Sequence, residues 1–253
     1  MKKIAGNPKG FTLAEVLITL GIIGIVASMT IPTLIENYQK TQYITGLKKA
    51  YAEVTEALKL MANDHGCPDD LLCVDVFDPA IDTSMSSKKI GNEFKKYFKL
   101  SKDCGNLSEL DTGCWADKTY YYYDKSSPDN FLRFDTTGLY DFLSADGMSY
   151  ALDGAPCANL HGLTGNNTKQ ICGELYVDVN GKNGPNAMGR DTFSFYITNG
   201  KGPAIYPEGG PELLQIGWGW RFASGQPVSC NKLFTNGSRC AARIMEEGWQ
   251  MNY

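Results

Sequence analysis

The sequence has little of what most enzymes and nucleic-acid-binding proteins use. It contains two histidines, His65 and His161, and neither lies in an H-E-x-x-H motif or beside a G-x-S-x-G nucleophile turn. A Walker A loop and a G-x-G-x-x-G fingerprint are also missing, and the glycine-rich run at 216–222 lacks the context of a phosphate site. The formal charge of -4 provides no basic excess for nucleic acid. These absences argue against an enzyme and against a nucleic-acid-binding protein.

The chain also lacks the repeated long apolar runs of a polytopic membrane protein. Its single such run, Val16 to Ile35, contains no charged residue, and about twenty residues of this kind span a bilayer as a helix. The remaining composition, with 43% hydrophobic residues overall and a mean hydropathy of -0.27, is that of a water-soluble protein. The sequence therefore predicts one membrane anchor followed by one domain of roughly 190 residues.

The first ten residues carry three lysines, Lys2, Lys3 and Lys9, and no acidic residue. By the positive-inside rule this end stays in the cytoplasm and the domain lies across the membrane. Two simple interpretations of the run are a secretory signal peptide cut near residues 26–28 and a plain single-pass anchor. Glu15 argues against both, because it is the only charge between residues 10 and 35 and a carboxylate within a bilayer is costly unless it has a partner.

The stretch G-F-T-L-A-E at residues 10–15, between a lysine-containing leader and a long apolar run, resembles the prepilin signature of type IV pilins and of type II secretion pseudopilins. The resemblance implies that a prepilin peptidase cuts between Gly10 and Phe11 and that Phe11 is then N-methylated. It also implies that the Glu15 carboxylate of one subunit pairs with the Phe11 ammonium of the next. Pro32 fits the family too, in which a proline often loosens the middle of this helix.

An apolar stripe at helical spacing follows the anchor. From Tyr43 onward apolar residues recur every three or four positions, with lysines and glutamates largely off the stripe. The stripe consists of Leu47, Ala50, Tyr51, Val54, Ala57, Leu58 and Met61. We expect one continuous helix from Phe11 to about Asn63, with this stripe packed on the domain.

The rest of the chain predicts an α+β domain with an antiparallel sheet. A short amphipathic helix is expected over 88–100, with Ile90, Phe94, Tyr97 and Phe98 on one face. Residues 239–253 predict one or two helical turns that end at Gly248, with Trp249 available to pack on the sheet. Strand-like runs bounded by Gly, Pro, Asn or Asp lie at 115–123, 131–134, 148–152, 174–179, 192–198 and 213–222.

Eight cysteines all lie beyond the anchor, on the side predicted to be exported. They fall into four local pairs with 5, 9, 14 and 9 residues between partners and form no C-x-x-C motif, which disfavours zinc-ribbon and thioredoxin-like sites. Eight cysteines allow about 105 complete pairings. We favour the sequential set because each pair brackets a polar, turn-rich loop. The predicted disulfides are Cys67–Cys73, Cys104–Cys114, Cys157–Cys172 and Cys230–Cys240.

Residues 175–195 form the candidate metal site. Two strand-like runs flank D-V-N-G-K-N-G-P-N, which is dense in the oxygen-bearing side chains that calcium prefers. The resemblance adds that secretion pseudopilins often carry a calcium in a loop of their C-terminal sheet. The EF-hand pattern fails, because its fifth position is Lys182 and its twelfth is Gly189. Asn-Gly and Gly-Pro-Asn also serve plain turns. A structured turn and a calcium site both stay open, the latter held by Asp178, Asn180, Asn186 and Asp191.

These features predict a pilin-like subunit with a long N-terminal helix packed on a disulfide-stapled antiparallel sheet. Its expected parts are a cleaved leader at 1–10, a transmembrane and assembly helix at 11–35, an amphipathic continuation at 36–63 and a globular head at 64–253. The expected partners are the membrane, the prepilin peptidase and methylase, and like subunits. We expect the head to lie outside the cytoplasm, in the membrane-anchored form and then in a periplasmic or extracellular filament.

The predicted function is structural and not enzymatic, and a type IV pilus and a type II secretion pseudopilus fit the sequence alike. The alternative is a minor pilin or adhesin whose head binds a surface or carbohydrate. Its candidate contacts are the aromatic residues Tyr120 to Tyr123 or Trp218 and Trp220.

Overall fold

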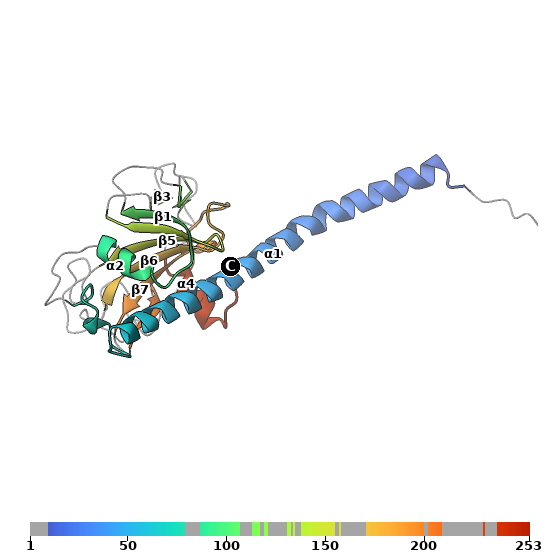
Figure 1. Ribbon diagram of the computed structural model, residues 1–253. Helices are drawn as coiled ribbons and strands as arrows, with labels where there is room; N and C mark the ends of the chain where they lie inside the picture. Colours follow the sequence, from blue (N-terminus) through green and yellow to red (C-terminus); the bar gives the residue numbers. More distant parts are fainter. Residues whose placement is uncertain are drawn as a thin grey trace, which may run out of the picture. The chain divides into compact units, whose positions relative to one another are not determined.

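The computed structural model describes the chain in separate stretches, and the chain divides into two compact units. The N-terminal unit is Met1–Gln42 and the head unit is Tyr43–Tyr253. The long helix α1, Leu13–Asp64, contributes residues to both (Figure 1). The described residues are 10–78, 87–106, 113–116, 119–120, 131–132, 134, 138–154, 157, 171–199, 202–208, 230 and 237–253.

Within the head unit, α1 buries one face. The buried residues are Tyr43, Leu47, Ala50, Val54, Ala57, Leu58, Met61 and Ala62. This face includes every residue of the predicted stripe except Tyr51, which is half-buried and packs against Phe195 with ring centroids 6.1 Å apart. The expected helix at 11–63 therefore agrees with the observed bounds to within two residues at each end.

The head unit contains a six-stranded antiparallel sheet in the order β1-β4-β5-β6-β7-β8 (Figure 1). Consecutive strands pair from β4 to β8, whereas β1 pairs with β4. Strands β2, Thr119–Tyr120, and β3, Phe131–Leu132, form a separate two-stranded sheet. The six strands are β1 Leu100–Asn106, β4 Tyr140–Ser144, β5 Ser149–Gly154, β6 Ile171–Asp178, β7 Thr192–Thr198 and β8 Ala204–Pro207.

The sheet is packed on both faces, as the alternation of side chains along β5 shows. Tyr150 and Leu152 belong to the large core cluster, which also contains the buried residues of α1. Ala151 points to the other face, where it packs in a smaller cluster with Trp115 and Phe134. The Trp115 and Phe134 rings stack there with centroids 4.2 Å apart. The sheet thus has a helix-covered face and a second face covered by segments that include Trp115.

Helix α2, Ser87–Phe94, corrects the helix predicted over 88–100. Ile90 and Phe94 are buried as expected, but the helix ends at Phe94 with a turn in which the Tyr97 N–H donates to the Phe94 carbonyl (3.0 Å). Tyr97 and Phe98 follow this turn, and Phe98 packs on Phe142 with ring centroids 5.3 Å apart. The apolar spacing that suggested a longer helix therefore reflects packing from a turn.

Most predicted strands of the head unit are present with shifted ends. Strand β7 has the predicted bounds, 192–198, while β5 and β6 lie within two or three residues of theirs. Strands β2 and β3 lie within the runs predicted at 115–123 and 131–134, whose residues 117–118, 121–123 and 133 lie outside the described part of the chain. The run at 213–222 lies outside the described residues. Strands β1, β4 and β8 have no counterpart among the predicted runs.

The C-terminal helix α4, Cys240–Glu246, is followed by Gly248, whose φ of +71° suits a glycine. Trp249 packs against the large core cluster, which contains buried residues of the sheet and of α1. Its ring lies edge-on to Tyr51 of α1, with centroids 5.7 Å apart, and the Lys48 Nζ lies 5.6 Å from the ring centroid. The end of the chain is thereby fastened to α1 within the head unit.

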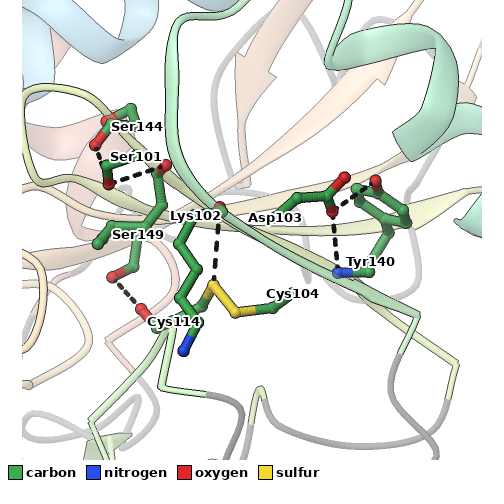
Figure 2. Close-up of a disulfide and its surroundings, with 10 residues drawn as sticks. Ser101, Lys102, Asp103, Cys104, Cys114, Tyr140, Ser144 and Ser149 are labelled. Atoms are coloured by element: carbon green, nitrogen blue, oxygen red, sulfur yellow. Dashed lines mark hydrogen bonds between the residues drawn. A yellow bond between two sulfur atoms is a disulfide. The ribbon is translucent and has the colours of Figure 1, made fainter.

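Four disulfides join neighbouring cysteines along the head unit, with the same partners that the spacing favours. Figure 2 shows Cys104–Cys114, which ties β1 to the segment that carries Trp115. The Ser149 hydroxyl of β5 donates to the Cys114 carbonyl (2.5 Å). The same strand β1 carries Asp103, whose carboxylate accepts from the Tyr140 hydroxyl (2.8 Å). The disulfide and these side chains hold the edge strand against the rest of the sheet.

Candidate functional site

The first candidate site is the start of α1. Gly10 and Phe11 precede the helix and are exposed, and the Phe11 side chain is 88% exposed. A Cβ on Gly10 would meet no described atom within 4 Å. The Gly10–Phe11 peptide bond is therefore uncovered by the described part of the chain, as a bond that a peptidase cuts must be.

Thr12 and Glu15 form a reciprocal capping box at this helix start. The Thr12 N–H donates to Glu15 Oε2 (2.8 Å), and the Glu15 N–H donates to Thr12 Oγ1 (3.2 Å). The Thr12 hydroxyl also donates to Glu15 Oε2 (2.9 Å). The Thr12 carbonyl accepts the first helical hydrogen bond, from Val16 (3.2 Å). Thr12 thus occupies the cap position and Glu15 the third helical position.

The capping box gives the Glu15 carboxylate a contact within its own subunit. Both Thr12 donors reach the same oxygen, Oε2. Among the described residues, Oε1 accepts no hydrogen bond, so one carboxylate oxygen stays available to another donor. Thr12 is absent from the residues that the sequence singled out, although T-x-x-E before an apolar run is a known capping pattern that predicts its role.

The part of α1 in the N-terminal unit presents an apolar surface. From residue 10 to residue 38 every side chain is exposed except Ala27, which is half-buried. The most apolar 18-residue window has a mean hydropathy of 2.1 and no buried residue. The hydroxyls of Thr19, Ser28 and Thr30 donate to backbone carbonyls three or four residues earlier, at 2.7–3.0 Å. The helix is thereby suited to anchoring in a membrane, where unpaired polar groups are costly.

Pro32 lies inside α1, and the helix continues through it. A proline has no N–H, so the carbonyl of Ser28, four residues earlier, loses its helical donor. Helix α1 therefore has a weakened position at Pro32, towards the end of its exposed apolar part.

The family model for the prokaryotic N-terminal methylation motif matches residues 6–31. The chain carries the prepilin signature of type IV pilins and pseudopilins. The matched residues include Gly10, Phe11, Thr12 and Glu15 and end one residue before Pro32. No solved structure matches the chain. The α+β head unit, the apolar helix and the four disulfides are consistent with a pilin-like fold, and the signature indicates a structural precursor instead of an enzyme.

The second candidate site of this prepilin-like chain is the loop between β6 and β7. Asp178 ends β6 and Asp191 precedes β7, and both side chains are fully buried. The Asp191 carboxylate accepts from the backbone N–H groups of Asn186 (2.8 Å) and Ala187 (2.6 Å). Asp178 accepts from the Asn180 N–H and, with its other oxygen, from the Thr192 hydroxyl, both at 3.2 Å. The hairpin thus brings together two carboxylates that lie thirteen residues apart in the sequence.

Burial gives these two carboxyl groups unusual electrostatics. It raises the pKa of Asp178 well above its usual value, and the Asp191 charge raises it further. Burial also raises the pKa of Asp191, although its hydrogen bonds from Ala187 and Asn186 oppose the shift. A charged pair at this site is therefore unfavourable unless a positive charge joins it.

The same loop also contains side-chain amide oxygens, which belong to the ligand class that a hard cation such as calcium prefers. Asn180 Oδ1 is buried and accepts no hydrogen bond in the described part of the chain. The Asn186 amide lies 3.1 Å from the Asn183 carbonyl oxygen and 3.3 Å from that of Gly181. Hydrogen bonding favours the nitrogen in that place, where it donates to both carbonyls and closes the turn, so a cation there would require the opposite orientation of the amide.

The four side chains predicted for calcium all lie between the end of β6 and the start of β7, where Asp178 and Asp191 are buried. Among the described residues, no group of three or more His, Cys, Asp or Glu side chains is placed to hold a metal. A cation in this loop would therefore depend on amide and backbone oxygens beside the two carboxylates.

Other residues considered from the sequence lie elsewhere. His65 follows α1, and its Nε2 lies 3.2 Å from a carboxylate oxygen of Glu93 in α2. His161, Tyr121 to Tyr123, Trp218 and Trp220 lie outside the described residues, and Tyr120 is part of β2.

Proposed function

We propose that this protein is a structural subunit of a type IV pilus or a type II secretion pseudopilus, assembled with like subunits through its N-terminal helix. In this proposal prepilin peptidase cuts between Gly10 and Phe11, and Phe11 is N-methylated. The supporting observation is a combination at one helix start. The residues matched by the methylation motif include Gly10 and Phe11, and the peptide bond between them is exposed. Hydrogen bonds from Thr12 hold the Glu15 carboxylate four residues from Phe11, the N-terminal residue that cleavage would create.

The capping box is compatible with the chain before and after cleavage. Cutting the bond turns the Phe11 nitrogen into an amine but leaves the Thr12 N–H in a peptide bond. The hydrogen bonds between Thr12 and Glu15 therefore persist. A methylated amine keeps its proton at neutral pH, so the new end is an ammonium in either form.

Assembly then joins two charges that a membrane disfavours. The ammonium of Phe11 in one subunit donates to the Glu15 carboxylate of its neighbour, at the oxygen that Thr12 leaves available. On assembly, the exposed apolar side chains of the helix leave their contacts with lipid and pack against the helices of other subunits. Pro32 gives the helix a weakened position at which it adapts to these neighbours.

Processing is tested by changing Gly10 and comparing a matched leader variant. Gly10→Leu should block the peptidase, so the chain keeps its ten leader residues and migrates as the precursor in the native host. Gly6→Leu alters a glycine of the same leader away from the cut and should be processed like the parent. Cleavage of Gly10→Leu at an unchanged site, or of the parent near residues 26–28, would refute the proposal.

A separate proposal concerns the β6–β7 loop, which we infer binds calcium through Asp178, Asn180, Asn186 and Asp191. Its support is the buried, unpartnered Asn180 oxygen beside two buried carboxylates. A ligand that binds only the folded state raises the melting temperature of the chain. Calcium should therefore raise it relative to chelator, and magnesium, which demands a stricter octahedral geometry, should raise it less.

Asp178→Asn distinguishes calcium binding from a plain turn. Because burial raises the Asp178 pKa, its charged form at neutral pH lowers the stability of the folded state. The neutral variant should thus be at least as stable as the parent in chelator but gain nothing from calcium. Equal melting temperatures of the parent in calcium and in chelator would reject the site.

A further inference from the structure

Asparagine is followed by glycine at four places in the chain, Asn180, Asn183, Asn199 and Asn236. Glycine has no Cβ and rotates freely, so its backbone nitrogen can approach the side-chain Cγ of the asparagine before it. In the folded chain this approach depends on the hydrogen bonds and the burial of each pair. Asn236 lies outside the described residues, and the other three asparagines have different surroundings.

Asn183 and Gly184 lie exposed in the loop between β6 and β7. Within the described part of the chain, the Asn183 side chain makes one hydrogen bond, in which Nδ2 donates to the Asn180 carbonyl (2.9 Å). The Gly184 N–H donates to no atom of the described residues. A Cβ on Gly184 would meet only the Asn186 amide nitrogen, at 4.0 Å. The asparagine side chain and the glycine nitrogen are therefore both accessible at this pair.

The Asn180–Gly181 pair of the same loop is held more firmly. Gly181 is buried, and its N–H donates to the Asp178 carbonyl (3.3 Å). A Cβ on Gly181 would clash with the Gly147 carbonyl oxygen, so the β4–β5 turn packs directly on this glycine. The Asn180 Nδ2 donates to the Gly184 carbonyl (3.2 Å). The nitrogen of Gly181 is thus engaged and shielded from water.

Asn199 is held through both ends of its side-chain amide. Its Oδ1 accepts from the Leu71 N–H (2.7 Å), and its Nδ2 donates to Asp70 Oδ1 (2.7 Å). Both contacts must open before Cγ can turn toward the next backbone nitrogen. A typical hydrogen bond changes such an opening equilibrium by about fivefold. The fold therefore protects Asn199 and Asn180 more than it protects Asn183.

We propose that Asn183 is a site of spontaneous deamidation in the folded chain. The Gly184 nitrogen attacks Asn183 Cγ, and the bond from Cγ to the side-chain nitrogen breaks. The proton of the Gly184 nitrogen leaves with this nitrogen as ammonia, and a succinimide ring remains. Water then opens the ring at either carbonyl and yields aspartate or isoaspartate. Water is the sole co-reactant, and no group is oxidised or reduced.

The product alters the β6–β7 loop. A carboxylate at residue 183 has no proton to donate to the Asn180 carbonyl at neutral pH, so the turn loses that hydrogen bond. The carboxylate also adds a negative charge to a loop that already contains the buried Asp178 and Asp191. This inference goes beyond the proposed function, because the reaction needs neither assembly nor calcium.

The full chain in detergent, incubated with chelator in mildly alkaline water labelled with heavy oxygen, provides the test. Peptide mass spectrometry then measures replacement of the side-chain nitrogen by heavy oxygen at each asparagine. Asn183 should convert about fivefold faster than Asn180 or Asn199, or more, because each of those pairs has a further hydrogen bond to open. Conversion of Asn183 at the rate of the other two, or more slowly, would overturn the proposal.

Two controls show whether the fold selects the site. In denaturant the three asparagines should convert at similar rates, because their hydrogen bonds are lost. An equally strong preference for Asn183 in denaturant would assign the selection to the local sequence and refute the structural argument. Gly184→Ala places a methyl group in open space, so it should keep the melting temperature but lose most of the conversion, since the side chain hinders the attack. Undiminished conversion in that variant would exclude attack by the residue-184 nitrogen.

Discussion

Replacing Glu15 by glutamine separates the two roles that the structure and the proposal give to this side chain. An amide oxygen still accepts from the Thr12 N–H and hydroxyl, as Gln does in other capping boxes, so the helix start is retained. The charge that would meet the neighbour's Phe11 ammonium is lost. Glu15→Gln therefore tests the ion pair, whereas Thr12→Ala weakens the cap and keeps the charge.

The two variants should differ strongly in size of effect. Thr12→Ala removes a side-chain cap, which contributes about 1 kcal/mol in typical helices and corresponds to about a fivefold change in an equilibrium. Glu15→Gln leaves an ammonium without its partner between packed helices. Losses of that kind exceed those of a cap by far, and we expect assembly to fall by about 100-fold or more.

The assay compares filament with membrane-bound monomer after shearing and fractionation of cells. Membrane insertion of Glu15→Gln should equal or exceed that of the parent, since a neutral side chain enters the bilayer more readily. Filament should be nearly absent for Glu15→Gln and only reduced for Thr12→Ala. Normal assembly of Glu15→Gln would show that Glu15 serves the cap alone and would refute the ion pair.

Two other predictions concern the head unit. A Cβ on Gly91 would lie 2.0 Å from Tyr140 Cγ, so Gly91→Ala should destabilise the full chain in detergent by about 1–3 kcal/mol, measured by thermal unfolding. Lys88→Ala on the same helix should have little effect. Unchanged stability of Gly91→Ala would contradict this packing. Non-reducing peptide mapping should recover four local disulfides. Free thiols at most of the cysteines would contradict the prediction that the head lies outside the cytoplasm. The expected pairs are Cys67–Cys73, Cys104–Cys114, Cys157–Cys172 and Cys230–Cys240.

Elements with one buried face were predictable from the sequence. The stripe of α1 recurs at helical spacing because α1 lies on the core, and its residues are buried with the exception of half-buried Tyr51. Strand β7 combines β-branched and aromatic residues between Asp191 and Asn199, and its predicted bounds are those observed.

Elements that are stabilised by residues far away in the sequence were not predictable in the same way. Strand β1 is largely exposed and contains Lys102, Asp103 and Gly105, so it lacks the alternation that marks a strand. It is held by pairing with β4, which places Lys102 opposite Leu143 across the sheet edge. The misplaced end of α2 has a similar cause, because Phe98 finds its ring partners in β4 and β5 and not along a helix.

The candidate sites divide along the same line. Gly10, Phe11 and Glu15 lie within six consecutive residues, so a local pattern is sufficient to find them. Asp178 and Asp191 were selected from one loop, yet their burial depends on how β6 pairs with β7. The head unit also has a groove lined by three separate segments, 49–60, 97–99 and 144–146, which only the fold brings together.

The most direct test of the account is the intact mass of the chain recovered from sheared filaments of the native host. We expect a chain that begins at Phe11, with 253 - 10 = 243 residues. Its mass should include one added methyl group at the N-terminus and the loss of eight hydrogens for four disulfides. A filament subunit that retains the leader or begins near Met29, or filaments that lack this chain altogether, would contradict the account.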